Sequence, residues 1–374
     1  MITTNSANKF SLREQKGQAI AKLNGIKRID EHSYKVKSQS SNDEYDVLNT
    51  ELGFICSCCD HIYRGVKCKH IYAVEFSLQL RKKVESSIVI QTVDTLACQF
   101  CSSKRHVKDA IRHNKHGDLQ RYLCKDCGKR FSVNIGFEGM RATPQVITSA
   151  MQLYFTGESL RNVQKFLRLQ GVNKSHVAIY KWIGKYVSLM EKYVEQIRPN
   201  VGNAWRTDEL FLKVKGNMKY LYALMDDETR FWIAQQISDT KYMADIHPLF
   251  KNGKEIAGKR PKTLISDGAR NFNEAFNKEF WTTKNPRTIH IRHIRMQGDH
   301  NNNKMERFNG EVRDREKVMR GLKKMDTPIL KGYQIFHNYI RTHEGLNNIT
   351  PAEACGIKIE GQNKWETLIQ NASR

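Results

Sequence analysis

The placement of the cysteines constrains the fold of this chain more than any other feature of its sequence. Eight of the nine cysteines lie between Cys56 and Cys127, and only Cys355 stands apart. Thiols of an intracellular protein stay reduced, so clustered cysteines indicate metal ligands rather than disulfides. We therefore expect small modules in this region, each held together by a bound metal because it is too short to build a large core.

The first cluster combines a Cys-x-Cys pair with a Cys-x-His pair. We predict one closed tetrahedral Zn²⁺ site whose ligands are Cys56, Cys58, Cys68 and His70. Two strand-like runs precede the cluster and a helix-like run follows it, an arrangement that resembles the SWIM zinc finger. Cys59 and His61 lie between the two pairs and remain candidate ligands. The alternative to a metal site is a set of buried free thiols.

The second cluster consists of two Cys-x-x-Cys knuckles, a pattern typical of a zinc ribbon. The predicted ligands of this second Zn²⁺ are Cys98, Cys101, Cys124 and Cys127. Phe131 follows the second knuckle and is expected to cover the metal. Residues 98–135 contain nine Lys and Arg against three Asp, so we also expect this module to contact DNA phosphates. A purely structural zinc is the alternative.

Charge indicates the class of partner. Lys and Arg outnumber Asp and Glu by 62 to 39, which leaves a net charge of +23. Such an excess favours a polyanion, most often nucleic acid, although a basic surface also serves solubility, ribosome binding or membrane surfaces. No apolar run approaches the ~18 residues of a membrane span, and the N-terminus lacks a signal-peptide pattern. We expect a cytoplasmic, nucleoid-associated protein with no membrane partner.

The middle of the chain has helical periodicity. Three stretches within residues 140–198 carry apolar residues three and four positions apart. Breaks at Thr156-Gly157 and at Gln170–Asn173 divide them, and Ser159 and Ser175 are the expected N-caps. Short helices joined by tight turns, the last rich in Lys, Tyr and Trp, suggest a helix-turn-helix that contacts DNA. The alternative is a plain three-helix bundle that links two domains.

Beyond Val201 the pattern changes to alternation. Three strands are predicted first, followed in order by a helix, the strand TLIS at 263–266, a helix, a strand near Ile289–Ile294, and a long helix from about Asn303 to Met319. This order is typical of ribonuclease-H-like domains. We therefore predict a multidomain α/β protein with a mixed β-sheet and flanking helices at its C-terminal end.

Three acids lie on strands and a helix that this topology is expected to bring close together. Asp208 is mid-strand, where an acid is unfavourable unless it has a function or an exposed face. Asp267 follows the strand TLIS, at the edge where α/β sites gather. Glu306 lies near the start of the last helix, with Arg313 and Lys317 on the same polar face. Each acid also has an ordinary interpretation, as a solvated strand residue, a turn residue or a salt-bridge partner.

Carboxylates in this arrangement suit phosphodiester chemistry. Magnesium is a hard cation that prefers carboxylate oxygens. Two such ions about 3.5–4 Å apart assist in-line displacement at phosphorus, one at the attacking oxygen and one at the leaving oxygen.

Residues from about Trp205 to Ile357 resemble the integrase-type catalytic core of insertion-sequence transposases, with the insertion-sequence-six-like branch nearest. The resemblance rests on W-R-x-D-E at Asp208, S-D-G at Asp267 and N-x-x-E-R-x-N-G-x-x-R-x-R-x-K around Glu306. A helix-turn-helix ahead of the core is also usual in that family. The SWIM finger is a departure, because it is better known from eukaryotic Mutator-like transposases.

The resemblance implies a function. Asp208, Asp267 and Glu306 would form a DDE triad that holds two Mg²⁺ or Mn²⁺ ions. The enzyme would nick double-stranded DNA at the element ends and join the freed 3′-hydroxyl to target DNA, acting as a homodimer or a larger synaptic oligomer. Many such enzymes keep a basic residue after the glutamate, so the expected DNA-phosphate contacts are Arg307, Arg313 and Lys317.

Two rival hypotheses remain: a zinc-dependent DNA-binding regulator derived from a transposase, and a ribonuclease or Holliday-junction nuclease on the same fold. The chain is expected to begin with a polar segment at 1–32, a SWIM-type finger at 33–85 and a zinc ribbon at 95–135. A helix-turn-helix at 140–198, a catalytic core at 203–357 and a C-terminal tail at 358–374 would follow.

Overall fold

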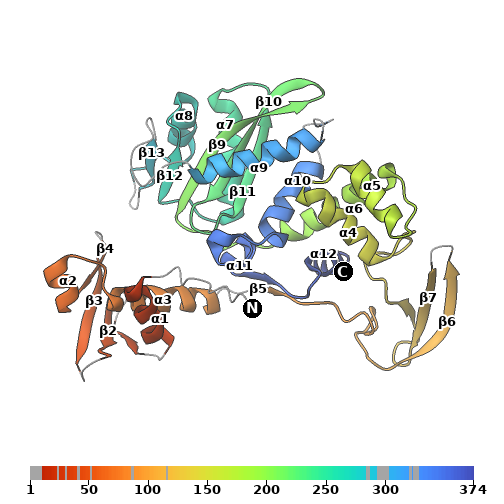
Figure 1. Ribbon diagram of the computed structural model, residues 1–374, viewed down its shortest axis with the longest axis horizontal. Coiled ribbons are helices and arrows are strands. Elements are labelled where there is room, and N and C mark those ends of the chain that lie inside the picture. The colour runs from red at the N-terminus through yellow and green to blue at the C-terminus, as the bar shows by residue number, and fades with distance from the viewer. Residues whose placement is uncertain are drawn as a thin grey trace, which may run out of the picture. The chain divides into compact units, whose positions relative to one another are not determined.

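The computed structural model describes residues 11–22, 25–29, 32–39, 43–50, 53–85, 88–114, 117–283, 287–292, 303–319, 322 and 328–374. The chain divides into two compact units, Met1–Ser87 and Ile88–Arg374, which are considered separately (Figure 1). Among the described residues, no helix combines the length and the apolar character needed to cross a membrane.

The N-terminal unit is a four-stranded antiparallel sheet with three helices. Its elements are α1 (Leu12–Lys22), β1 (Ile26–Arg28), β2 (Ser33–Lys37), β3 (Glu44–Thr50), β4 (Gly53–Cys56), α2 (Cys59–Arg64) and α3 (Lys69–Glu85). Helix α1 packs closely on α3, since a Cβ at Gly17 would come within 2.6 Å of Tyr72 Cβ. Because α1 and β1 belong to this unit, the boundary predicted between residues 32 and 33 falls inside it.

The second unit begins with a short strand, β5 (Ile88–Ile90), and a three-stranded antiparallel ribbon. The ribbon strands are β6 (His106–Asn114), β7 (Gly117–Cys124) and β8 (Arg130–Ser132). Buried Phe131 stacks on Tyr122, and the ring of His106 meets both edge-on. These rings and the cysteines make up a core too small to be stable without further support.

The helical region folds as its sequence predicts. Helices α4 (Pro144–Thr156), α5 (Leu160–Leu169) and α6 (His176–Val194) are separated at the predicted breaks. The side chains of Ser159 and Ser175 accept hydrogen bonds from the backbone N–H groups of Asn162 and Ala178, which confirms both N-caps.

The same helices are packed by the end of the chain. Helix α6 lies against α10 (Pro328–Ile335) and α12 (Lys364–Ala372), which buries Trp365, Leu368 and Ile369. Strand β14 (Ile357–Ile359) pairs in parallel with β5. Residues 358–374, predicted as a tail, are thus part of the packed unit. The prediction missed them because β14 is three residues long and its partner is 269 positions away.

The central sheet has the order β11-β10-β9-β12-β13. Strands β9 (Ala204–Val214), β10 (Asn217–Asp226) and β11 (Trp232–Ser238) are antiparallel, whereas β12 (Thr263–Ser266) and β13 (Ile289–Arg292) run parallel to β9. The connecting helices are α7 (Met243–Ala257), α8 (Arg270–Glu279) and α9 (Asn303–Met319). This is the ribonuclease-H-like order, so the fold prediction is confirmed. The part of the predicted strand at 293–294 lies outside the described residues.

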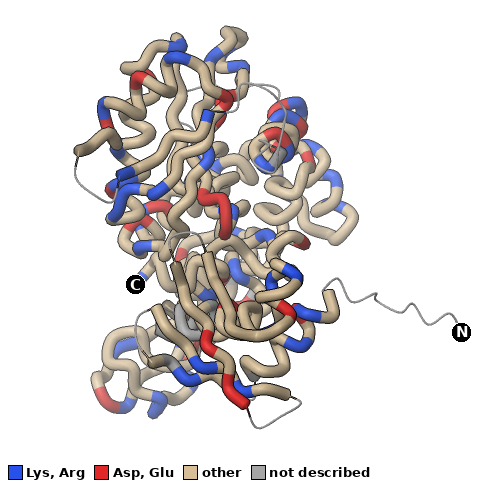
Figure 2. Tube along the Cα trace, turned by 90° about the vertical axis from the view of Figure 1, so that its left-hand side faces the viewer, with Lys and Arg blue, Asp and Glu red and all other residues tan. Residues whose placement is uncertain are grey.

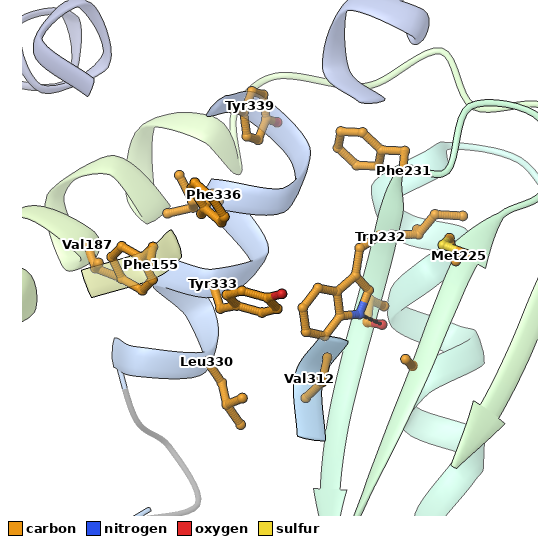
Figure 3. Close-up of a cluster of buried hydrophobic side chains, with 14 of the residues drawn as sticks. Phe155, Val187, Met225, Phe231, Trp232, Val312, Leu330, Tyr333, Phe336 and Tyr339 are labelled. Atoms are coloured by element: carbon orange, nitrogen blue, oxygen red, sulfur yellow. Dashed lines mark hydrogen bonds between the residues drawn. The ribbon is translucent and has the colours of Figure 1, made fainter. Parts of the chain in front are cut away.

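Helices cover both faces of the sheet, as neighbouring residues of β11 show. The Trp232 ring meets Phe308 of α9 edge-on at 4.7 Å, whereas Ile233 lies near Gly253 of α7. Adjacent strand residues point to opposite faces, so α9 and α7 lie on opposite sides (Figure 1). Figure 3 shows Phe155 and Val187 on one side of α10 and Tyr333 turned toward Trp232 on its other side, so the helical region and the sheet share one core.

The outer edge of β11 is closed by side-chain amides rather than by another strand. Asn338 accepts a hydrogen bond from the Trp232 N–H at 2.8 Å and donates one to the Trp232 carbonyl at 3.0 Å. Gln334 donates to the same carbonyl at 2.9 Å. These bonds satisfy polar groups that an open sheet edge would expose, so the segment after α9 stabilises the sheet.

Candidate active site and metal-binding clusters

The pairing register of β9 and β12 brings two of the predicted acids together. The parallel pairing ends with Arg206 opposite Ile265. Two residues further along each strand are Asp208 and Asp267, so the same register places them side by side. Strand β12 ends at Ser266, and the chain turns away at Gly268, whose φ is +87°. Asp267 is therefore presented at the carboxyl end of β12, as predicted.

A third carboxylate, that of Glu209, joins this pair. Oxygen atoms of Asp208, Glu209 and Asp267 all lie within 4.8 Å of one another. The sequence did not single out Glu209, because neighbouring residues in a strand point to opposite faces. Here β12 pairs with β9 only as far as Arg206, so the edge of β9 is open beyond it and both side chains reach Asp267.

Asp208 is held by the residues around it. Asn309 Nδ2 of α9 donates to its Oδ2 over 2.9 Å, and the Glu209 N–H donates to its Oδ1 over 2.9 Å. Burial raises the pKa of Asp208 to about 6, and the charges of Asp267 and Glu209 add to the increase. Three carboxylates that repel one another form a donor set of the kind a divalent, oxygen-preferring cation needs.

Lys241 forms an ion pair with one acid of this cluster, Glu209. Its ammonium group pairs with Glu209 Oε1 and lies 5.0 Å from the ring centre of Phe211 and 4.8 Å from that of Tyr220. Glu209 Oε2 is buried, with no hydrogen-bond partner among the described residues. Lys241 thus offsets part of the charge of Glu209, whose carboxylate also lies close to Asp208 and Asp267. Sequence reasoning missed Lys241, since 32 residues separate it from Glu209.

The third predicted acid, Glu306, has a different position. It lies exposed in the first turn of α9 and is not among the carboxylates that approach one another within 4.8 Å in the described part of the chain. Asn309, one turn later, makes the contact with Asp208 instead. The structure therefore brings together Asp208 and Asp267 but leaves Glu306 on the neighbouring helix.

The three predicted phosphate contacts are all exposed on α9. Arg313 and Lys317 follow Glu306 at seven and eleven positions, and this spacing puts them on the same side of the helix. Arg307 lies on the other side, where it lines a cavity of about 200 Å³ with Lys304 and other residues. Lys and Arg lie along much of the chain rather than in one patch (Figure 2).

The first cysteine cluster assembles with the predicted residues. Atoms of Cys56, Cys58, Cys68 and His70 lie within 4.8 Å of one another, and all four residues are buried. His70 Nδ1 is 3.8 Å from Cys56 Sγ and 3.9 Å from Cys68 Sγ. Tetrahedral zinc, with bonds of about 2.3 Å to sulfur and about 2.0–2.1 Å to nitrogen, sets N···S separations of roughly 3.6 Å, so the cluster is close to the geometry that this metal needs.

The two spare candidates of this cluster lie outside it. Cys59 is exposed, and His61 Nδ1 is 2.9 Å from the Val66 carbonyl. Neither belongs to the group of atoms that face one another.

The second cysteine cluster assembles in the same way. Cys98 Sγ is 3.6 Å from Cys127 Sγ, and Cys101 Sγ is 3.5 Å from Cys124 Sγ. Gly128, with φ of +68°, forms the turn after the second knuckle. Phe131 is buried beside the cluster, as predicted. Four sulfurs at these separations also fit tetrahedral zinc.

The part of the chain that carries the acid cluster is similar in sequence to known proteins. Residues 202–343 match a family model described as a DDE domain. The transposase for insertion sequence-like element IS431mec of Staphylococcus aureus is 31% identical over 129 residues, which cover 33% of this chain and 55% of that protein. The transposase for insertion sequence element IS257 in transposon Tn4003, also from Staphylococcus aureus, matches with the same values.

Solved structures give a weaker likeness. The catalytic core domain of HTLV-2 integrase in complex with magnesium aligns with a TM-score of 0.30 and 16% identity, over 42% of this chain and 98% of that one. The chain spans about half the length of the curated relatives, 55%. Residues 202–343, which carry Asp208, Asp267 and Glu306, form a domain similar to the DDE domains of insertion-sequence transposases.

Proposed function

We propose that this protein is a DDE-type DNA transposase that nicks element-end DNA and joins the freed 3′-hydroxyl to target DNA. The observation that carries the proposal is the register of β9 and β12, which sets Asp267 beside Asp208 at an open sheet edge. The similarity of residues 202–343 to DDE domains supports the same assignment.

The chain's own residues would act in distinct ways in this reaction. Asp208 and Asp267, together with Glu306 from α9, would hold two Mg²⁺ or Mn²⁺ ions. Bound there, the ions supply activation of the attacking oxygen and stabilisation of the leaving oxygen. Lys241 orients Glu209 by its ion pair and lowers the negative charge at the edge of the cluster. Arg313 and Lys317 extend a cationic side of α9 along which a DNA backbone would lie, and Arg307 would contact a more distant phosphate.

The N-terminal modules would deliver the substrate. Cys56, Cys58, Cys68 and His70 would hold one Zn²⁺ in the finger at 33–85, and the second cysteine set would hold another in the ribbon at 95–135. Exposed Arg161, Lys165 and Lys181 of α5 and α6 fit contact with duplex DNA by the segment 140–198. Joining two element ends requires at least two active sites, so the working form would be a homodimer or a larger synaptic complex.

A strand-cleavage assay tests this proposal. Duplex DNA that carries the sequences flanking the gene is incubated with the full chain and Mg²⁺ or Mn²⁺. We expect nicks at a defined position with wild-type protein, and loss of at least about 1,000-fold in rate with Asp267→Ala, because several kcal/mol of metal-based stabilisation is removed. Undiminished nicking by this variant would refute the assignment.

The same assay separates the rival functions. An RNA/DNA hybrid and a four-way junction are offered beside the element-end duplex. Preference for either would favour a ribonuclease or a junction nuclease. Tight, sequence-specific binding of the duplex without metal-dependent cleavage would favour a DNA-binding regulator.

A further inference from the structure

Helix α9 is tied to strand β9 at three places. Near the start of the helix, Asn309 Nδ2 donates to Asp208 Oδ2 over 2.9 Å. Near its end, the Lys213 N–H donates to Glu316 Oε1 over 2.7 Å. Beyond the helix, the Leu322 N–H donates to the Lys213 carbonyl over 2.8 Å. Lys213 is five residues, or about 16 Å, along the strand from Asp208, so only the first tie touches the acid cluster.

Asn309 is poorly explained as a residue that only stabilises the fold. Its side chain is 3% exposed, so the amide is out of contact with water. Its Oδ1 is buried and has no hydrogen-bond partner among the described residues. A buried amide that leaves half of its hydrogen-bonding capacity unused costs stability. What the amide contributes is its bond to Asp208.

That bond also links the start of α9 to the acid pair. Glu306 precedes Asn309 by three residues, so both lie on the same side of the helix, about 4.5 Å apart along its axis. A helix held at Asn309 therefore presents Glu306 one turn away from Asp208. Lys304 pairs with Asp227 and Phe308 packs on Trp232, so other contacts also hold the first turns of α9. The bond from Asn309 is the contact that joins those turns to the acid pair.

We propose that Asn309 is a positioning residue: by holding Asp208, it fixes the first turn of α9 beside the acid pair, so that Glu306 can complete the divalent-metal site. The inference rests on the proposed function for the existence of that metal site. It adds a residue outside the three acids, one that acts on the metal through Asp208 and Glu306.

Manganese affinity of the full chain, measured by isothermal titration calorimetry, tests the proposal. We expect Asn309→Ala to weaken Mn²⁺ binding by about 10- to 100-fold, the usual effect of removing a partner that orients a ligand. Glu316→Ala is the matched control, because it also removes one hydrogen bond between α9 and β9 but at the far end of the helix. It should stay within about twofold of wild type. Equal losses in the two variants would overturn the proposal.

Two further variants separate positioning from other roles. Asn309→Leu keeps the bulk of the side chain but no donor, so its Mn²⁺ affinity should stay well below that of wild type. Wild-type affinity in this variant would overturn the proposal. Glu306→Ala should weaken binding strongly in the wild-type background and by less than about twofold in the Asn309→Ala background, since coupled residues are not additive. Additive losses would overturn the proposal.

Hydrogen exchange of the metal-free protein gives an independent measurement. Amides of residues 307–310 should exchange at least about tenfold faster in Asn309→Ala, and those of residues 315–318 should be unchanged. Unchanged exchange at 307–310 would overturn the proposal. A wild-type protein that binds no Mn²⁺ contradicts the proposed function, whereas wild-type and Asn309→Ala proteins that bind it equally contradict only the role of Asn309.

Discussion

Asp208, Glu209 and Asp267 place three negative charges in a space that suits one or two divalent cations. Burial and the neighbouring acids raise the pKa of Asp208 to about 6. Ionised groups held together in this way destabilise the metal-free protein, a cost that functional sites commonly carry. A bound cation reverses the effect, because it replaces repulsion among the carboxylates by attraction to a shared charge.

At the scale of this residue cluster, we predict opposite effects of Asp267→Asn with and without metal. The metal-free variant should unfold at a slightly higher temperature than wild type, because one charge of the repelling set is gone. The stabilisation by millimolar Mn²⁺ that wild type shows should be lost. Thermal unfolding with and without Mn²⁺ measures both effects. Asp239→Asn, in the turn after β11, is the control, and it should keep the Mn²⁺ shift.

At the scale of single elements, two glycines inside helices have opposite surroundings. A Cβ at Gly253 of α7 would come within 2.3 Å of Leu224 Cδ2, so any side chain there would have to displace the buried Leu224 of β10. A Cβ at Gly184 of α6 would meet no atom within 4 Å. Glycine lowers helix stability relative to alanine by about 1 kcal/mol, so only the first glycine has a packing reason.

This difference predicts substitutions of opposite sign. Gly253→Ala should lower the free energy of unfolding by about 1–3 kcal/mol, because the methyl group overpacks the contact between α7 and the sheet. Gly184→Ala should raise it by up to about 1 kcal/mol, because it restricts the unfolded chain without a clash. Urea unfolding of the two variants measures both changes. A stabilised Gly253→Ala protein would contradict the close packing described for α7.

At the scale of the whole molecule, the two units are stabilised by different means. The N-terminal unit has few apolar residues in its core, and three of them are cysteines of the first cluster. The second unit has a large shared core of sheet and helices. If both cysteine sets bind zinc as proposed, its removal should unfold the first unit and the ribbon β6–β8 and leave the central sheet intact.

Single cysteine variants test this difference. Cys58→Ser should lower the zinc content by about one equivalent and expose residues 12–85 to proteolysis, because a structural zinc contributes folding energy directly. Cys59→Ser, one position later and exposed, should retain both the zinc and the protection. Elemental analysis and limited proteolysis provide the measurements. Zinc loss in the second variant rather than the first would contradict the ligand assignment.

Much of the architecture could be predicted because its signals are local. Ser159 and Ser175 cap their helices through bonds to amides three residues ahead, and TLIS is a strand with the predicted bounds, 263–266. The members of each Cys-x-Cys, Cys-x-His and Cys-x-x-Cys pair are two or three positions apart, so each pair can be recognised in the sequence alone. Asp208 and Asp267 were found by the strand pattern and by their family-like motifs. Glu306 was located on its helix in the same way, although the structure leaves it apart from the other two.

Local patterns in the sequence thus predict the order of the elements, the members of the two Cys/His clusters and the acids Asp208 and Asp267. The tertiary structure alone decided that Glu209 joins those acids, that Lys241 neutralises it and that Asn309 holds Asp208 from 101 positions away. It also decided that the end of the chain pairs with β5. The physical reason is that such contacts depend on strand register and helix packing, and these are set by cores formed between segments far apart in the chain.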